Sequence, residues 1–526
     1  MRAGIVYIFR MPKPRPDQPG SLPGAWTVAC WLLPLATLVL QLATYRGYGF
    51  FRDELYYLAS AEHLGLGYVE HPPMIGLIAW LVRSTLGDSL FAARLLPAVA
   101  HGATVALAAR LAREMGGARY AQFLAALATA LAPAYVGICG ILSMNAFDIM
   151  FWAALWLVTA RALRTEGTRP WLLFGLVAGI GLQNKISVLF VAFGIVAGLV
   201  VARRWRVFRS WHIWAGGALA GAIFLPHLLW QWHHGWPTLE FMANATREKN
   251  VSLPPAAFVT EQVMQMGALA APLWIAGLSG LLARERFRPF RPIGWAYLAV
   301  LAVMLATNAK PYYLAPAYTA LFAAGAVGFE AIRRSTARPA IRALMVLLVG
   351  ISGAVALPFA KPVLSTDAFL RYSAALGMGP RSEERQELGR LPQQYADMHG
   401  WQELALNLAK VYNALPPADR ERACILVRNY GEAGAVDVLG APLGLPRAIS
   451  GHNSYFLWGP RGCTGEVVIA LGGERKDYEE VFASVERAAV HTCADCMPYE
   501  NNRPIWVARR ARVPMAELWP RVKRFI

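Results

Sequence analysis

The stretch that decides the fold class is residues 25–57, AWTVACWLLPLATLVLQLATYRGYGFFRDELYY. The block from Ala25 to Tyr45 is apolar and can cross a bilayer, since a helical span needs roughly 17 to 25 such residues. Two acidic residues, Asp53 and Glu54, follow shortly after it. Unpaired carboxylates are costly in hydrocarbon, so acidic side chains at a membrane boundary are candidates for a functional site. The stretch therefore predicts a membrane enzyme.

The composition extends this interpretation to the whole chain. Of 526 residues, 56% are hydrophobic, and they form long blocks separated by short arginine-rich connections. Such blocks cross a bilayer as helices, because backbone polar groups in lipid must bond within their own segment. The net charge of +18 could indicate a nucleic-acid-binding protein. Because the basic residues stand mostly in short loops, we interpret them as topology signals and expect no nucleic-acid partner.

The apolar blocks predict an α-helical polytopic membrane protein with about eleven transmembrane helices. The candidate spans are 25–45, 90–109, 120–138, 147–163, 171–183, 187–202, 211–230, 263–282, 293–307, 311–329 and 344–359. With the N-terminus in the cytoplasm, every even-numbered connection lies there too. These connections carry Arg110, Arg113, Arg119, Arg161, Arg164, Arg169, Arg203, Arg204, Arg206, Arg209, Arg284, Arg286, Arg288, Arg291, Arg333, Arg334, Arg338 and Arg342. Positive loops stay inside, so one orientation fits the whole pattern and places Asp53 outside.

The segment before the first span, residues 1–24, is predicted to be a basic cytoplasmic tail. It carries Arg2, Arg10, Lys13 and Arg15 among several prolines. The first apolar block has the length of a span and is not followed by a small-residue cleavage site, so we expect it to be retained as a helix. The transmembrane domain then covers residues 25–360.

After residue 360 the chain changes in character. From residue 361 to residue 526 the charge density rises, and β-rich runs at 424–427, 467–471 and 505–508 alternate with helix-like stretches at 400–412 and 478–489. This pattern predicts a small α/β domain, which lies outside by the same parity. The outer domain could select the acceptor of a reaction that takes place at the membrane surface.

Four cysteines stand in this predicted outer domain: Cys424, Cys463, Cys493 and Cys496. They could form disulfides, because the compartment outside would be oxidising. The Cys493-Ala494-Asp495-Cys496 spacing also fits a redox or metal motif, but a single CxxC without a second pair is weak evidence. A structural or incidental role is the alternative.

Four motifs occur in an order that is found in a known family. They are Arg52-Asp53-Glu54 after the first span, Glu70-His71-Pro72-Pro73 in the same loop, Asp148 at the outer start of the fourth span, and Lys310-Pro311-Tyr312-Tyr313-Leu314-Ala315-Pro316 at the outer start of the tenth. Together they resemble the family 39 glycosyltransferases, which include protein O-mannosyltransferases and, more distantly, bacterial aminoarabinose and galacturonic acid transferases that modify lipopolysaccharide. The resemblance covers roughly residues 45–329. It implies a GT-C fold and transfer of a sugar from a polyprenyl-phosphate lipid to an outer acceptor, with inversion at the anomeric carbon.

The acidic residues are the candidates for catalysis. An inverting transfer needs a base beside the acceptor hydroxyl, and Asp53 is our choice because a carboxylate is the simplest such group. The resemblance points to the same position and implies a structural or metal-assisting role for Glu54. Alternatively, Asp53 pairs with Arg52 or Arg46 at the headgroup boundary. Asp148 could orient the acceptor or hold a cation, but it could equally be a helix-start carboxylate favoured by the helix dipole.

Other residues are candidates for binding the donor phosphate, because cations must meet the charge that develops on the leaving group. Lys310 is the first candidate, and Tyr312 and Tyr313 beside it are further candidates. Its alternative role is that of a lysine that snorkels to headgroups beside an aromatic belt. His71 replaces the lysine that relatives acting on lipid A usually have, and a structural role for it is at least as good. Arg247 could also grip the phosphate.

Arg247 belongs to a second outer loop, residues 231–262, whose basic and aromatic residues are His233, His234, Trp236, Arg247 and Lys249. This loop could hold the phosphate or cover the sugar, but an interfacial belt with solvated charges is slightly favoured. Imidazoles and carboxylates could bind a divalent cation here. Since no spacing amounts to a metal motif, we expect no required metal or other cofactor.

A transporter or flippase of a polyprenyl-linked sugar is the alternative function. Transporters often show repeats and helices broken at the midplane, and neither is evident in this sequence. A membrane-anchored sensor would explain residues 361–526 but not the charged residues between the spans. An enzyme explains more of the chain. The richness in Ala, Arg and Gly indicates a bacterium, so we expect the inner membrane, a site on the periplasmic side, undecaprenyl phosphate as carrier, and lipid A, an envelope glycan or a protein as acceptor.

Overall fold

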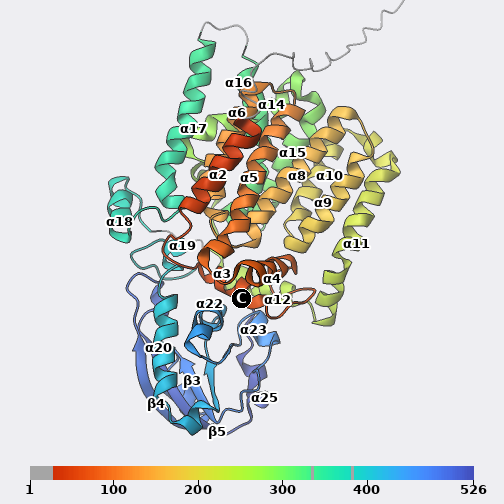
Figure 1. Cartoon of the computed structure of the whole chain (residues 1–526). Coiled ribbons are helices and arrows are strands. Elements are labelled where there is room, and N and C mark those ends of the chain that lie inside the picture. Colours follow the sequence, from red (N-terminus) through yellow and green to blue (C-terminus); the bar gives the residue numbers. More distant parts are fainter. Residues whose placement is uncertain (1–27, 333–336, 381–383) are drawn as a thin grey trace, which may run out of the picture.

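The computed structural model describes residues 28–332, 337–380 and 384–526. A bundle of helices makes up most of the molecule, and a β-sheet lies beyond one end of the bundle (Figure 1). We call this end of the bundle the sheet end. The predicted basic tail, residues 1–24, and Arg333 and Arg334 lie outside the described residues.

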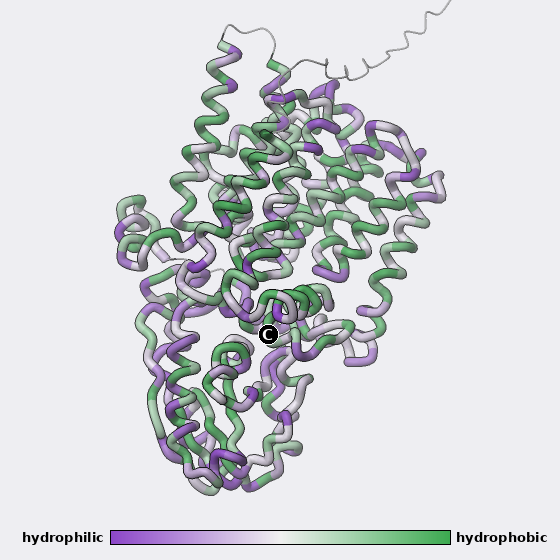
Figure 2. Tube along the Cα trace, in the orientation of Figure 1, coloured by the Kyte–Doolittle hydropathy of each residue, from purple (hydrophilic) through white to green (hydrophobic). Residues whose placement is uncertain are grey.

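The bundle follows the predicted apolar blocks closely. Its helices are η1 (Val28–Leu32) continuing into α2 (Leu33–Ala43), α5 (Leu90–Glu114), α6 (Arg119–Leu131), α7 (Pro133–Ile138), α8 (Met144–Thr165), α9 (Pro170–Asn184), α10 (Val188–Val201), α11 (Trp211–His233), α13 (Pro255–Gln265), α14 (Ala271–Ala283), α15 (Arg291–Ala306), η6 (Pro311–Ala317) continuing into α16 (Tyr318–Glu330), and α17 (Arg338–Ala360). Figure 2 shows that this part of the molecule is the more hydrophobic one.

The number of membrane spans is a separate question from the number of helices. By length and composition, five helices among the described residues can cross a membrane: Leu90–Glu114, Met144–Thr165, Trp211–His233, Glu285–Ala306 and Arg338–Ala360. A sixth span results if the pair Pro255–Gln265 and Ala268–Ala283, bent by 95°, is counted as one. The count of eleven therefore stays a prediction.

The surface of the bundle suits contact with lipid. Along α11 the side chains of Trp214, Leu229 and Trp232 are 66%, 51% and 70% exposed. Large apolar side chains exposed in this way on a soluble protein would be a liability, whereas in a bilayer they face hydrocarbon. The helices of the chain thus have the character of a multi-pass membrane protein.

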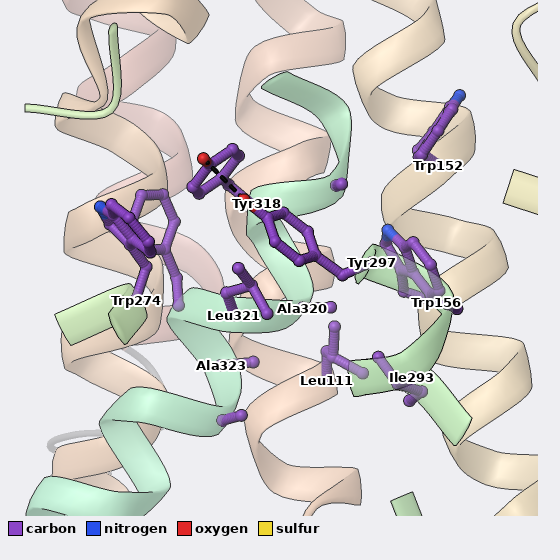
Figure 3. Close-up of a cluster of buried hydrophobic side chains, with 14 of the residues drawn as sticks. Leu111, Trp152, Trp156, Trp274, Ile293, Tyr297, Tyr318, Ala320, Leu321 and Ala323 are labelled. Carbon is purple, nitrogen blue, oxygen red and sulfur yellow. Dashed lines mark hydrogen bonds between the residues drawn. The ribbon is translucent and has the colours of Figure 1, made fainter. Parts of the chain in front are cut away.

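The interior of the bundle is packed with aromatic and small side chains. Trp152, Trp156, Trp274, Tyr297 and Tyr318 are buried in one cluster, and the hydroxyls of the two tyrosines lie 2.9 Å apart (Figure 3). Small residues let the helices approach closely. A Cβ at Gly277 of α14 or Gly325 of α16 would lie 2.0 Å from a backbone oxygen of the other helix.

The five arginine-rich connections meet at one end of the bundle, as the alternation of charge predicts. Arg164 pairs with Glu114, and Arg286 donates to the carbonyl of Gly116 at 2.8 Å. Further bonds join Arg204 to Arg288, Ala118 to Glu330 and Tyr120 to Arg342. These contacts link all five connections, and Figure 1 shows their end opposite the sheet. The parity of the helices is therefore consistent throughout the bundle.

Three helices lie across the sheet end instead of running along the bundle: α3 (Arg52–Ser60), α4 (Met74–Leu86) and α12 (Pro237–Asn244) (Figure 1). Of these, α3 is buried from Leu55 to Ser60. Its apolar side chains share one core with the strands of the sheet and with Tyr430. As a result, α3 is fixed between the bundle and the C-terminal region, by which we mean residues 361–526.

The C-terminal region contains a five-stranded mixed sheet in the order β2-β1-β3-β5-β4. The strands are β1 (Ala423–Leu426), β2 (Ala448–Ile449), β3 (Val467–Leu471), β4 (Phe482–His491) and β5 (Arg503–Ala511). β1 pairs in parallel with β2 and β3, whereas β5 runs antiparallel to β3 and β4. Helix α20 (Trp401–Ala414) covers one face of the sheet with Leu404 and Leu408. The predicted strands are confirmed, and so is the helix predicted at 400–412.

The helix predicted at 478–489 is wrong. Only the short α24 (Arg475–Glu479) is helical there, and residues 482–491 form strand β4. β4 pairs with β5 along its length, from Phe482 opposite Ala511 to His491 opposite Arg503. Pairing with a strand that comes later in the chain overrides local helix propensity, and the sequence of the segment alone does not reveal it.

Candidate active site

Asp53 stands in the first turn of α3, at the sheet end of the bundle. Its side chain is 28% exposed, and its Oδ1 accepts a hydrogen bond of 2.8 Å from the hydroxyl of Tyr430. Arg52 approaches the same oxygen at 3.6 Å. No described residue donates a hydrogen bond to Oδ2. One carboxylate oxygen is thus held in place while the other is available to a substrate.

Tyr430 comes from α22 (Tyr430–Ala435), a short helix of the C-terminal region that packs directly on α3. A Cβ at Gly434 of α22 would lie 2.7 Å from the backbone of Leu55, so this close approach requires glycine. The guanidinium of Arg52 lies 5.3 Å from the centre of the Tyr430 ring. The C-terminal region therefore contributes directly to the surroundings of Asp53.

Glu54 lies in a closed set of contacts. It is fully buried, and each of its oxygens accepts two hydrogen bonds. Arg94 donates to both oxygens, at 3.0 and 2.7 Å, and the backbone N–H groups of Leu142 and Phe51 donate at 2.8 Å each. Arg94 also donates to the carbonyls of Tyr45 and Gly49. These contacts favour the structural role that was expected as one alternative for Glu54.

Five charged residues are linked to Asp53 directly or through one another, and we call them together with it the charged cluster. They are Arg52, Lys249, Lys310, Glu384 and Asp397. Lys310 Nζ donates to Glu384 Oε1 at 2.7 Å, and Lys249 Nζ lies 3.6 Å from the same oxygen. Arg52 lies 3.6 Å from Asp397. The cluster brings together residues from four separate parts of the chain.

Burial and neighbouring charges shift the protonation of the cluster. Although burial raises the pKa of Glu384, the ammonium groups of Lys249 and Lys310 outweigh it and lower the pKa overall, so this carboxylate stays ionised. Burial lowers the pKa of Lys249, and Glu384 opposes the shift. Burial raises the pKa of Asp397 to about 6 despite the nearby Arg52. The charge of the cluster therefore becomes more positive as the pH falls through about 6.

Asp148 belongs to a second group at the same end, in the first turns of α8. It is 2% exposed, and Ser187 donates to its Oδ1 at 2.5 Å. Lys185 lies 3.6 Å from its Oδ2 and donates to the side chain of Asn145 at 2.6 Å. The ammonium of Lys185 also faces the ring of Tyr313, 4.7 Å from its centre. Asp148 is the fifth residue of α8, beyond its first turn, and is paired with Lys185. Its role in orienting the acceptor or holding a cation stays a prediction.

The histidine predicted as a phosphate ligand is placed among aromatic rings. His71 is 1% exposed, and the rings of Tyr68, Tyr57 and Tyr56 lie 4.6, 5.3 and 6.0 Å from its own. Its Nε2 has no hydrogen-bond partner among the described residues. Burial lowers its pKa to about 4, so the ring is neutral at pH 7. A neutral buried imidazole suits the structural role better than the binding of phosphate.

The remaining predicted phosphate ligands are divided. Arg247 is 70% exposed, and its side chain binds Glu248 at 2.8 Å and Asn244 at 2.9 Å instead of a member of the charged cluster. Lys249, two residues later, is the member of that loop that reaches the cluster. Tyr312 and Tyr313 pack against each other with ring centres 4.7 Å apart, next to Lys185 and on the same segment as Lys310. The structure thus brings Lys310 and the two tyrosines to the site and leaves Arg247 outside it.

Four residues of the site were not singled out from the sequence: Lys185, Glu384, Asp397 and Tyr430. Lys185 could have been found, because a lone lysine between two apolar blocks, on the side without arginines, departs from the charge pattern. The other three come from the C-terminal region, and no local motif marks them. Among the described residues there is no group of three side chains suited to a metal ion. The expectation of no required metal stays a prediction.

Comparison with known proteins yields similarities in both sequence and fold. The family model described as dolichyl-phosphate-mannose-protein mannosyltransferase matches residues 70–230. The lipid A galacturonosyltransferase RgtD of Rhizobium johnstonii is 25% identical over 280 residues, which cover 50% of this chain and 56% of that protein. The match thus spans about half the length of this curated relative.

The solved structures of ArnT from Cupriavidus metallidurans are similar over nearly the whole chain. The structure bound to undecaprenyl phosphate has a TM-score of 0.56 at 15% identity and covers 93% of this chain and 99% of that one. The apo structure has a TM-score of 0.55 at 15% identity, with 92% and 97% covered. The predicted resemblance to the family 39 glycosyltransferases is therefore confirmed, and the chain has the fold of a GT-C membrane glycosyltransferase.

Proposed function

We propose that the chain is an inverting glycosyltransferase that moves a sugar from a polyprenyl-phosphate donor to an acceptor at the membrane surface. The observation that carries the proposal is the position of Asp53. One of its oxygens is held by Tyr430 and the other accepts no hydrogen bond from a described residue, while Lys249 and Lys310 stand in the same charged cluster. A base and cations for a phosphate leaving group thus belong to one cluster, which supports such a transfer.

The reaction assigns a separate task to each group. The acceptor hydroxyl oxygen attacks the anomeric carbon while its proton passes to Asp53. The bond from that carbon to the phosphate oxygen breaks, and the lipid phosphate leaves with its negative charge. Lys249 and Lys310 meet this charge, because an ammonium group is a compact positive charge that suits a phosphate. Attack from the side opposite the phosphate inverts the anomeric carbon.

Tyr430 is a positioning residue in this mechanism, since its hydroxyl holds the oxygen of Asp53 that does not take the proton. Lys185 and Asp148 lie at the same end, beside Tyr313, and form a second polar group that a sugar could contact. Phosphate binding by His71 and Arg247 is not part of the proposal. The buried ring of His71 is neutral, and Arg247 is exposed and paired with Glu248.

Lipid A is the acceptor that we propose first, and undecaprenyl phosphate the carrier. The curated relative is named as acting on lipid A, and the ArnT structure contains undecaprenyl phosphate. Both lipids would place the reaction on the periplasmic side of a bacterial inner membrane. The arginine-rich connections at the opposite end of the bundle support this orientation, because positive loops stay in the cytoplasm.

The test is sugar transfer by the purified protein in detergent. Undecaprenyl-phosphate sugars with a radiolabelled sugar are offered one by one, with lipid A as acceptor, to wild type and to Asp53→Asn. Asp88→Asn is the matched control, because Asp88 lies in the same loop, pairs with Arg83 and is 41% exposed. We expect transfer that needs Asp53 and not Asp88. Movement of the intact lipid sugar across vesicles without turnover, unaffected by Asp53→Asn, would instead indicate a transporter.

A further inference from the structure

The loop between β4 and β5 carries a pair of cysteines that the proposed reaction does not use. Cys493 is half-buried, and Cys496 is only 4% exposed. The thiol of Cys496 donates to the carbonyl of Cys493 at 3.0 Å. Among the free cysteines of the described residues, Cys493 is the one that is not buried, since Cys30 and Cys139 are enclosed in the bundle. The pair thus combines an accessible sulfur with a buried one.

The two sulfurs differ in reactivity as well as in exposure. A hydrogen bond from Cys496 lowers the pKa of Cys493, and the same contact, followed by burial, raises the pKa of Cys496. Cys493 also lies against the start of α20, where a Cβ at Gly400 would be 2.8 Å from its sulfur. Helix N-termini stabilise thiolates. An accessible thiol with a lowered pKa beside a buried thiol is the arrangement of a dithiol that reacts by disulfide exchange.

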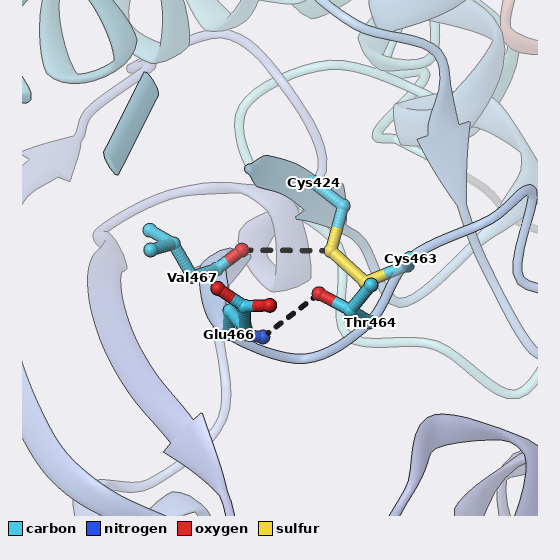
Figure 4. Close-up of a disulfide and its surroundings, with 5 residues drawn as sticks. All are labelled: Cys424, Cys463, Thr464, Glu466 and Val467. Carbon is cyan, nitrogen blue, oxygen red and sulfur yellow. Dashed lines mark hydrogen bonds between the residues drawn. A yellow bond between two sulfur atoms is a disulfide. The ribbon is translucent and has the colours of Figure 1, made fainter. Parts of the chain in front are cut away.

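The C-terminal region already contains one disulfide. Cys424 of β1 is bonded to Cys463, 39 residues later, in the segment that precedes β3 (Figure 4). Disulfides form and persist in oxidising compartments. The Cys493–Cys496 pair lies in the same region and would meet the same oxidants.

The loop that holds this pair also reaches the charged cluster. Tyr499, three residues after Cys496, accepts a hydrogen bond of 2.7 Å from Arg52 and donates one of 3.4 Å to Asp397. The backbone N–H of Cys493 donates to the side chain of Asn501 at 2.8 Å, which ties the two ends of the loop together. A change at the cysteines therefore bears on a tyrosine that contacts the neighbour of Asp53.

We propose that Cys493 and Cys496 are a modification site, at which a disulfide-bearing oxidant converts the dithiol to a second disulfide that holds Tyr499 on Arg52. The Cys493 thiolate attacks a sulfur of the oxidant, forms a mixed disulfide and releases one thiolate. The Cys496 sulfur then gives up its proton, attacks the sulfur of Cys493 and releases the second thiolate. Two thiols are oxidised, and the disulfide of the oxidant is reduced to two thiols.

The first test assigns the two roles with oxidised glutathione as the oxidant. The full chain in detergent is incubated with it, free thiols are alkylated, and the peptide that contains residues 493–496 is weighed. We expect an unalkylated, internally bonded peptide from the wild type. Cys496→Ser should accumulate a glutathione adduct on Cys493 at least about ten times faster than Cys493→Ser does on Cys496. Equal rates in the two variants, or alkylated thiols in the wild type, would overturn the proposal.

The second test measures the effect on Tyr499 without relying on transferase activity. Chymotryptic cleavage after Tyr499 is followed in oxidised and in mildly reduced protein. We expect at least about five-fold slower cleavage in the oxidised wild type, because the loop then opens less often. A Cys493→Ser/Cys496→Ser double variant should show the same rate in both conditions. Equal rates in the wild type would refute the link to Tyr499, whether or not the chain transfers a sugar.

Discussion

The adjacent carboxylates Asp53 and Glu54 should respond in opposite ways to the loss of one charge. In Glu54→Gln one of two oxygens becomes an NH2 group. Each oxygen of Glu54 accepts two hydrogen bonds, so the NH2 group of the glutamine faces two donors in either orientation. The substitution also removes the negative charge that is paired with the buried Arg94. Removing one partner of a buried ion pair costs about 3–5 kcal/mol. We expect Glu54→Gln to lower the unfolding free energy by that amount.

Asp53→Asn should leave stability almost unchanged and lower turnover strongly. Asparagine can still accept the hydrogen bond from Tyr430, and the ion pair with Arg52 is long at 3.6 Å and partly exposed, so its loss costs less than about 1 kcal/mol. Loss of a general base lowers the rate by about 10²–10⁴-fold. The two variants thus separate a chemical role from a structural role at neighbouring positions.

The assay measures the apparent melting midpoint and the rate of sugar transfer for each variant in the same detergent. An Arg94→Met/Glu54→Gln double variant completes the cycle, and it should lose less stability than the sum of the single changes by at least about 2 kcal/mol. A stable Glu54→Gln protein without turnover would refute the structural assignment of Glu54. An unstable Asp53→Asn protein would refute the assignment of Asp53 as the base.

Three further predictions follow from the site. Tyr430→Phe removes the hydroxyl that binds Asp53, so turnover should fall about ten-fold at an unchanged melting midpoint. The control is Tyr455→Phe, which loses a 3.0 Å hydrogen bond to a different carboxylate, that of Asp437, and should keep turnover within about two-fold. Lys249→Met should raise the KM for the lipid donor about ten-fold, and Arg247→Met, at an exposed neighbouring position, less than about two-fold. Burial raises the pKa of Asp397 from 3.8 to about 6, so the folded protein binds this proton more tightly than the unfolded chain does. The protonated carboxyl therefore contributes stability that is fully present below pH 4 and is lost as the pH rises through 6. Asp397→Asn removes this pH dependence, so the stability of the variant relative to the wild type should improve by about 3 kcal/mol between pH 4 and pH 7. The measurement is the melting midpoint of both proteins as a function of pH, and a constant difference between them would contradict the shift.

The sequence predicts the features of this fold that depend on local composition. Apolar blocks become helices because the backbone in lipid has no other partner, and arginine-rich connections gather at one end because their charge sets the orientation. Asp53 is found for the same reason, since its cost at a membrane boundary is visible in the sequence. The segment 482–491 shows the limit. Its strand depends on β5, which lies later in the chain, and local propensity favours a helix instead.

The partners of Asp53 could not be predicted, because they depend on contacts between distant segments. Tyr430 is 377 residues away from Asp53 along the chain, and nothing in its own surroundings marks it as functional. Arg247 and Lys249 show the same limit at short range. Both are basic residues of one loop, and only the fold decides that Lys249 is turned toward Glu384 while Arg247 is exposed. The burial that keeps His71 neutral arises in the same way, from three tyrosines that pack around it.

The contacts of the C-terminal region also change what its removal would test. Deletion of residues 361–526 would show altered acceptor choice if the region only selected the acceptor. In the structure the region supplies Glu384 and Asp397 to the charged cluster, binds Asp53 and Arg52 through Tyr430 and Tyr499, and covers α3. The deletion would therefore expose the core of α3 and remove the carboxylate of Glu384 from Lys249 and Lys310. We expect loss of turnover with every acceptor, so acceptor selection has to be tested by point variants that leave these four side chains in place.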